Sequence, residues 1–287
     1  MNWVNRKMKK SEINQKRYKG FTLVELLVVV VIIAVLMGML IPAVMRSKVR
    51  ARIATARADM SNIKGAILSY QTDYSRFPVP RPRMDPATGL PTVLLPNWAL
   101  QDGVPPRVGG GDMTFGGAVK PGYNRPNYGV MRILCSVNDL PPPTSTPPAL
   151  PLPVTLTVNG NFSRNPKKNK YLDVPSGDNI GDPGLDPIYN FNDPWRQQYI
   201  ITMDMDGDGD CSDRYYRKDA IYSSVSGPGT VKIGLRQSQW ESQTGAIEPE
   251  YVLKGSVMVY SKGPDQKAND TVSALEGVNE DNILDWR

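Results

Sequence analysis

Four aspartates form the densest group of chemically active side chains in this sequence. They alternate along residues 204–210, as Asp204, Asp206, Asp208 and Asp210. Oxygen ligands at alternate positions, with Gly209 at the sixth, are typical of the start of an EF-hand calcium loop. The twelfth position is Tyr215, so the bidentate glutamate of a complete EF-hand is absent. The pattern leaves two interpretations, an EF-hand-like calcium site and a solvated acidic hairpin turn.

The residue types present exclude several kinds of catalysis. The chain has no histidine, which removes Ser-His-Asp and Cys-His nucleophile activation and histidine-ligated metals. Its two cysteines, Cys135 and Cys211, cannot form a zinc knuckle, and the sequence leaves open whether they form a disulfide or remain two thiols. Asp204 and Asp206 could serve acid–base catalysis, but no activated nucleophile accompanies them. We therefore expect no enzyme and keep a membrane-anchored hydrolase only as an alternative.

Positive charge is concentrated at the N-terminus. Residues 1–20 carry seven Lys or Arg and one Glu, and the rest of the chain carries 27 residues of each sign. A nucleic-acid-binding protein normally concentrates basic residues on its folded part. We therefore expect no nucleic-acid partner.

A long apolar run follows this basic segment. Twenty consecutive residues, 26–45, carry no charge, and as a helix they span about 30 Å, the thickness of the hydrocarbon layer. We expect a membrane helix with its N-terminus in the cytoplasm, because basic residues flank the cytoplasmic end of such helices. Glu25 lies one turn into this helix, where a carboxylate is costly and usually has a partner.

The residues around Glu25 carry a resemblance. Basic residues followed by Gly20-Phe21-Thr22-Leu23-Val24-Glu25 and the apolar run resemble the class III signal of type IV pilins and type II secretion pseudopilins. The resemblance implies that a prepilin peptidase cuts between Gly20 and Phe21 and methylates the new terminus. It also implies that Glu25 of one subunit neutralises the Phe21 amine of its neighbour in a filament, and that the helix loosens near Pro42.

The elements that must position these residues follow from periodicity. Apolar residues spaced by three and four predict a helix face that packs on the folded domain: Ile53, Ala56, Met60, Ile63, Ile67, Tyr70 and Tyr74. We expect the basic side chains of residues 46–57 to be solvated and to lie near lipid headgroups. Strands are predicted at 198–203 and 255–260, with further candidates at 128–137, 154–158 and 230–233.

These patterns predict an α+β, pilin-like fold, with a long N-terminal helix on a small antiparallel sheet. The expected parts are a cleaved cytoplasmic leader (1–20), the membrane half of the helix (21–45), its amphipathic half (46–77), a proline-rich insertion (78–187) and a sheet region with a C-terminal loop (188–287). Residues 78–187 contain most of the 26 prolines, a density that prevents long helices and central strands.

Two later segments resemble major pseudopilins. Asp193-Pro194-Trp195 is similar to their Asp-Pro-Trp segment, and the residues from Ser261 to Trp286 resemble their C-terminal loop. In that family the loop holds calcium, which implies Asp265 and Asp281 as ligands here, with Ser261 and Asn282 as helpers. We prefer this loop to the Asp204–Asp210 site, because a cation joining its two ends would offset the entropy of ordering it.

The function implied by the resemblance is structural. We expect a subunit of a type II secretion pseudopilus, polymerised from the bacterial inner membrane by an assembly ATPase and a platform protein, with its C-terminal domain in the periplasm. A type IV pilus subunit for adhesion, motility or DNA uptake is the alternative. Aromatic residues make up 8% of the chain and are not clustered, so nothing supports a tethered sugar-binding domain.

Overall fold

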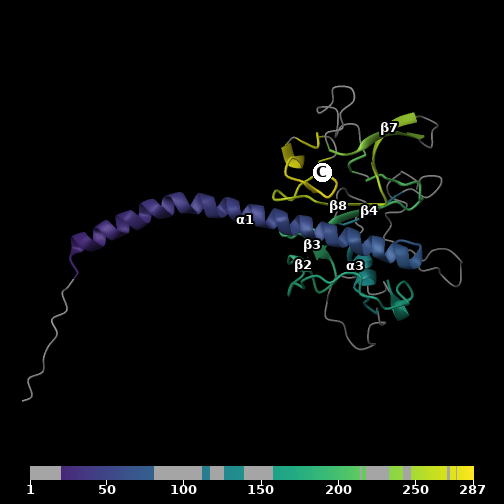
Figure 1. Cartoon of the computed structure of the whole chain (residues 1–287), viewed down its shortest axis with the longest axis horizontal. Coiled ribbons are helices and arrows are strands. Elements are labelled where there is room, and N and C mark those ends of the chain that lie inside the picture. The colour runs from purple at the N-terminus through teal and green to yellow at the C-terminus, as the bar shows by residue number, and fades with distance from the viewer. Residues whose placement is uncertain are drawn as a thin grey trace, which may run out of the picture. The chain divides into compact units, whose positions relative to one another are not determined.

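The computed structural model describes residues 21–80, 112–116, 126–138, 158–213, 215–217, 233–241, 247–269, 272–275 and 277–287. The chain divides into two compact units, Met1–Arg50 and Ala51–Arg287. The described part of the first unit is helical, and the second unit carries the sheets and both hydrophobic cores (Figure 1).

The helix α1 (Leu23–Tyr74) is 52 residues long and is continuous through Pro42. We expected this proline to loosen the helix, because it cannot donate a backbone hydrogen bond and its ring crowds the carbonyl of Gly38. The structure keeps α1 helical on both sides of Pro42.

The second half of α1 packs on the folded domain, which confirms the predicted apolar face. Its buried residues are Ala56, Met60, Ile63, Ala66, Ile67 and Tyr70. Ile53 and Tyr74 are partly buried against the same core. These positions recur every three to four residues, so one side of the helix is buried while the other side stays polar and exposed.

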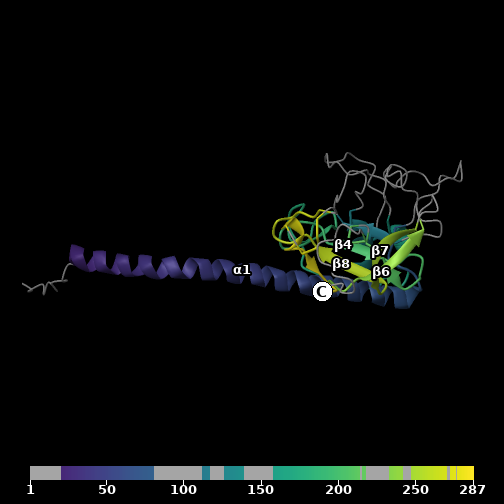
Figure 2. The ribbon, with the colours of Figure 1, turned by 90° about the horizontal axis from the view of Figure 1, so that it is seen from above.

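A four-stranded antiparallel sheet lies against this face of α1 (Figure 2). Its strand order is β1 (Met113–Phe115), β4 (Ile200–Met203), β8 (Val257–Ser261) and β9 (Ile283–Leu284). Alternate residues point to opposite faces of a sheet. Residues such as Ile201 and Val259 therefore join the core with α1, and their neighbours Ile200 and Tyr260 join a second core on the other face.

The second core is closed by another antiparallel sheet, in the order β5 (Asp210–Cys211), β7 (Ile247–Lys254) and β6 (Arg236–Glu241). Aromatic rings dominate this core. Tyr216 makes edge-on contacts with Tyr260 and Trp286, with ring centroids 5.0 and 5.5 Å apart. The four-stranded sheet therefore has a hydrophobic core on each of its faces, one shared with α1 and one shared with the second sheet.

Smaller elements complete the described chain. They are a helix, α3 (Tyr128–Leu134), two 3-10 turns, η1 (Gly160–Phe162) and η3 (Gly277–Asn279), and a short hairpin of β2 (Gly184–Leu185) with β3 (Phe191–Asn192). Within 78–187, the described segments contribute Phe115, Ile133 and Leu172 to the core with α1.

The strand predicted at 128–137 is wrong, because the structure forms α3 there. Val130, Ile133 and Leu134 are buried together, at the spacing of one helix face. A short apolar run has no periodicity that separates a strand from a helix. The strands predicted at 198–203 and 255–260 are confirmed as β4 and β8. Of the candidates at 154–158 and 230–233, only Val158 and Ile233 lie within the described residues, and neither is in a strand.

Neighbouring residues of α1 provide a matched test of this packing. Ile67 is fully buried, whereas Leu68 is 39% exposed. We expect Ile67→Ala to lower the free energy of unfolding by about 2–5 kcal/mol because it leaves a cavity between α1 and the sheet. Leu68→Ala should change it by less than about 0.5 kcal/mol. Urea unfolding in detergent, followed by tryptophan fluorescence, measures both values. Equal effects would contradict the assigned helix face.

Candidate functional site

The first turn of α1 contains a reciprocal hydrogen-bonded cap. The N–H and the hydroxyl of Thr22 donate to Oε2 of Glu25 over 2.9 and 2.7 Å, and the N–H of Glu25 donates to the Thr22 hydroxyl over 3.3 Å. This is the capping-box arrangement, which satisfies backbone donors that a helix start leaves free. A carboxylate at this end is also favoured by the helix dipole.

The local role of Glu25 was missed in the sequence, although the spacing Thr22-x-x-Glu25 is itself the capping-box signal. Phe21 lies just before α1 and its side chain is 77% exposed. Gly20 and the rest of the leader lie outside the described residues. The structure therefore positions the two predicted residues Phe21 and Glu25 at the exposed start of the helix.

The first half of α1 presents apolar side chains on all sides. Leu23, Leu36 and Met39 are among the exposed large hydrophobic residues, and all the described residues before Arg50 are exposed. Within the described chain, α1 is the one helix that is long and apolar enough to cross a membrane. A helix that is apolar around its whole circumference needs an apolar environment, which here supports anchoring in a membrane by a single helix.

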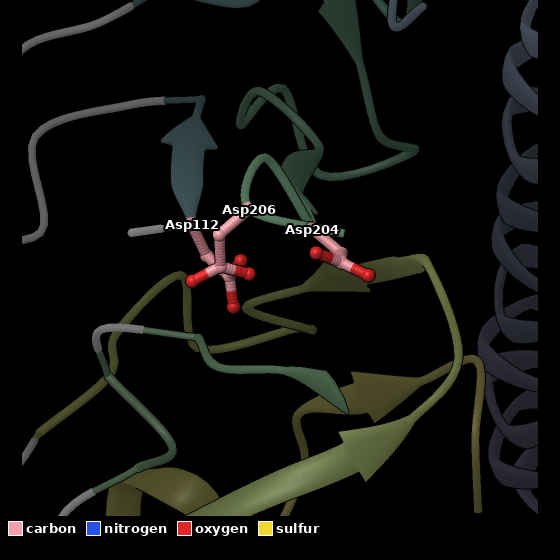
Figure 3. Close-up of side chains that lie close together, drawn as sticks. All are labelled: Asp112, Asp204 and Asp206. Carbon is pink, nitrogen blue, oxygen red and sulfur yellow. The ribbon is translucent and has the colours of Figure 1, made fainter. Parts of the chain in front are cut away.

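The acidic loop after β4 contains internal hydrogen bonds to Asp204. It also lies beside Asp112, which is distant in the sequence. Asp204 accepts the N–H groups of Gly207 and Gly209 over 2.6 and 3.0 Å. Ligand oxygens of Asp112, Asp204 and Asp206 lie within 4.8 Å of one another (Figure 3). No local pattern predicts Asp112 as a member of this cluster, because the pairing of β1 with β4 brings it to the loop.

The other two predicted members of this loop lie apart from that cluster. Asp208 accepts the N–H of Asp210 over 2.8 Å, and Asp210 forms an ion pair with Arg236. Burial raises the pKa of Asp112 to about 7, opposed by a hydrogen bond from the Ser212 N–H and assisted by the nearby charges of Asp206 and Asp204. The cluster thus concentrates negative charge that a proton or a cation would relieve.

The C-terminal loop brings its two predicted acidic residues together. The N–H of Asp265 donates to Oδ2 of Asp281 over 2.9 Å. Oδ1 of Asp281 is buried and accepts no hydrogen bond from the described residues. Burial raises the pKa of Asp281, and the neighbouring Asp265 charge adds to the shift. A buried acceptor without a donor is costly, so this oxygen is suited to a cation.

The two expected helpers of this loop have other partners. The hydroxyl of Ser261 donates to Oδ2 of Asp193 over 2.5 Å and accepts the N–H of Gly263 over 3.0 Å. The side-chain amide of Asn282 lies 2.9 Å from the Tyr216 hydroxyl. These contacts fix the two ends of the loop to β8 and to the aromatic core, and so hold the acidic residues in place.

The two cysteines are free thiols in separate cores. Cys211 is buried in the core between the two sheets, and Cys135 is partly buried at the core with α1. Burial raises the pKa of the Cys135 thiol to about 11 and raises that of Cys211 as well. Protonated, buried thiols are poor nucleophiles and poor metal ligands. Of the two outcomes that the sequence left open, the structure has unpaired thiols.

Comparison with known proteins identifies the N-terminal signal. Residues 15–41 match the prokaryotic N-terminal methylation motif. These residues include Gly20, Phe21 and Glu25 together with most of the exposed apolar run. No solved structure matches the chain.

Curated relatives give a consistent name. The chain is 30% identical over 89 residues to the type II secretion system core protein G of Aeromonas hydrophila, covering 31% of this chain and 62% of that protein. It is 38% identical over 63 residues to the protein of the same name from Klebsiella pneumoniae, covering 22% and 45%. The one from Pseudomonas aeruginosa is 31% identical over 78 residues, covering 27% and 55%. The chain thus spans about half the length of the curated relatives it matches. Together, the methylation motif and these relatives support placing this chain in the pseudopilin family.

Proposed function

We propose that the chain is a structural subunit of a type II secretion pseudopilus. The single observation that carries this proposal is the start of α1, where Phe21 and Glu25 precede an apolar helix surface that no other described residue covers. The names of the relatives favour a secretion pseudopilus over the alternative, a type IV pilus for adhesion, motility or DNA uptake.

In this function α1 is first a membrane anchor. The seven basic residues of the leader favour a cytoplasmic N-terminus and a periplasmic second unit, Ala51–Arg287. A prepilin peptidase in the inner membrane cleaves the Gly20–Phe21 peptide bond and methylates the new amine. The product exposes an ammonium group at Phe21, four residues before the carboxylate of Glu25.

Assembly then follows from electrostatics in a medium of low dielectric constant. Glu25 is partly compensated within its own subunit by the two donors of Thr22. In the bilayer its charge still favours an additional cation, because charges in hydrocarbon are poorly solvated. The Phe21 ammonium of a neighbouring subunit supplies one. An assembly ATPase and a platform protein draw the subunits from the membrane, the helices bundle, and the growing filament pushes secreted proteins outward.

Processing provides the first test. We expect the mature protein to begin at N-methyl-Phe21, and Gly20→Leu to retain residues 1–20, because a branched side chain replaces the small residue at the cleaved bond. Intact-mass analysis of protein extracted from membranes measures both. Gly38→Leu is the control, since a Cβ added at Gly38 meets no atom within 4 Å and the residue lies away from the cleaved bond. A wild-type protein that keeps its leader would contradict the proposal.

A second test separates the two roles of Glu25. Glu25→Gln keeps an oxygen for the cap but removes the charge, whereas Thr22→Val removes the hydroxyl of the cap but keeps the charge. We expect both variants to be processed, and only Glu25→Gln and Glu25→Ala to lose most of their filament yield, measured by sedimentation of sheared filaments. If Thr22→Val alone loses its filaments, the cap rather than the charge drives assembly.

We also propose that the subunit binds calcium in the C-terminal loop, through Asp265 and Asp281. The support is the short contact between the two residues and the buried, unpaired Oδ1 of Asp281. A bound cation would neutralise this oxygen and join the ends of a loop whose residues 267–269 form no regular structure. The second candidate site is the acidic loop, where Asp204 and Asp206 meet Asp112.

Chelation distinguishes the two sites. We expect a calcium chelator to lower the melting temperature of the full chain in detergent, because the ion binds the folded state alone. Asp265→Ala with Asp281→Ala should abolish this difference, and Asp204→Ala with Asp206→Ala should leave it intact. If the second pair abolishes it instead, the ion belongs to the acidic loop. A melting temperature that does not respond to the chelator would contradict both sites.

A further inference from the structure

Three basic residues follow directly on the apolar half of α1. Arg46, Lys48 and Arg50 begin one residue after the uncharged run ends at Met45. All three side chains are exposed. Their spacing of two residues rotates successive side chains by about 200° around a helix, so Arg46 and Arg50 lie on one side of α1 and Lys48 on the opposite side. We call these three residues the basic collar.

The chain offers the collar little negative charge of its own. No Asp or Glu occurs between Glu25 and Asp59. None of the ion pairs found within the described residues involves a collar side chain. Basic residues elsewhere do have such partners, such as Lys64 with Asp285 and Lys167 with Asp73. Within the described residues, the three positive charges of the collar therefore have no acidic partner.

The position of the collar matches the headgroup layer of a membrane. The polar layer on each side of the hydrocarbon is about 5–8 Å thick. Along a helix, the collar extends from about 1.5 to 8 Å beyond Met45. If residues 26–45 fill the hydrocarbon, the three charges lie within this layer, at the level of the lipid phosphates. Arg57 lies about 18 Å beyond Met45 and is outside it.

We propose that the basic collar binds the headgroups of anionic phospholipids. Guanidinium groups form paired hydrogen bonds with phosphate oxygens, and the lysine adds a compact charge. Lipid is favoured over a second copy of the chain because the collar is continuous with the apolar surface that the bilayer itself covers. The interaction goes beyond the filament function and is independent of the direction in which the helix crosses the membrane.

Lipid selectivity at the protein surface measures this binding. The full chain is reconstituted into phosphatidylcholine vesicles that contain spin-labelled phosphatidylglycerol or spin-labelled phosphatidylcholine. Each basic residue near an anionic surface contributes about a fivefold preference. We expect wild-type protein to enrich the anionic label at least about fivefold, and Arg46→Gln/Lys48→Gln/Arg50→Gln to lower this enrichment by about fivefold or more, with any remainder due to the basic leader and Arg52. Raising NaCl to about 1 M should weaken the wild-type preference.

A control variant that loses three positive charges elsewhere tests whether lipid binding depends on the position of the collar next to the apolar run. Arg57, Lys168 and Lys254 are exposed residues of the second unit, and their triple replacement by Gln should keep the wild-type enrichment. A wild-type enrichment near one, or a collar variant that keeps the full wild-type enrichment, would overturn the proposal. So would inorganic phosphate that abolishes the preference when chloride of equal ionic strength does not, because the ligand would then be free phosphate. A collar variant that loses self-association but keeps its lipid preference would point to a second copy instead.

Discussion

The exposed apolar surface of α1 is the constraint on which the rest of the molecule depends. Large hydrophobic side chains from Leu23 to Met45 have no cover within the described residues, although most large apolar residues of the second unit are buried. Exposing such an area to water is unfavourable, so lipid or other helices must surround it. The second half of the same helix is covered on one face, by the sheet. The helix α1 is therefore suited to an apolar surrounding along its first half and to the folded domain along its second half. The basic residues 46–57 lie where the two halves join.

The folded unit is organised around strands that are buried on both faces. β4 and β8 each consist of buried residues throughout, because α1 covers one face and the aromatic core covers the other. Asp213 shows how a charged group is accommodated in this interior. Asp213 is fully buried and accepts hydrogen bonds from Thr202 and from the N–H groups of Tyr215 and Tyr216. The acidic residues of the two candidate calcium sites lie in the segments that flank the strands of the four-stranded sheet.

Sequence patterns predicted the elements that have a long periodicity or a local signal. They did not predict contacts between residues that lie far apart in the sequence. The helix face from Ala56 to Tyr70 follows from its spacing alone, and β4 and β8 follow from their β-branched runs. The helix α3 was mistaken for a strand because seven residues carry too little periodicity. Asp265 and Asp281 were paired through a resemblance, whereas Asp112 joins Asp204 through a strand pairing that no local signal indicates. The capping role of Glu25 was readable but was overlooked beside its charge.

The edge strand β9 has a consequence for the order of events during synthesis. Its residues pair with Ser261 and Tyr260, and the adjacent Asp285 forms an ion pair with Lys64, 221 positions earlier in the chain. At 5–20 residues per second, a ribosome needs about 10–45 s to make the intervening chain. The residues that cover the apolar face of α1 are spread from Phe115 to Ile283, so this face is covered in steps as the chain is made. Insertion of the first half of α1 into a membrane can precede folding, whereas the core with α1 is complete only after β9 has been made.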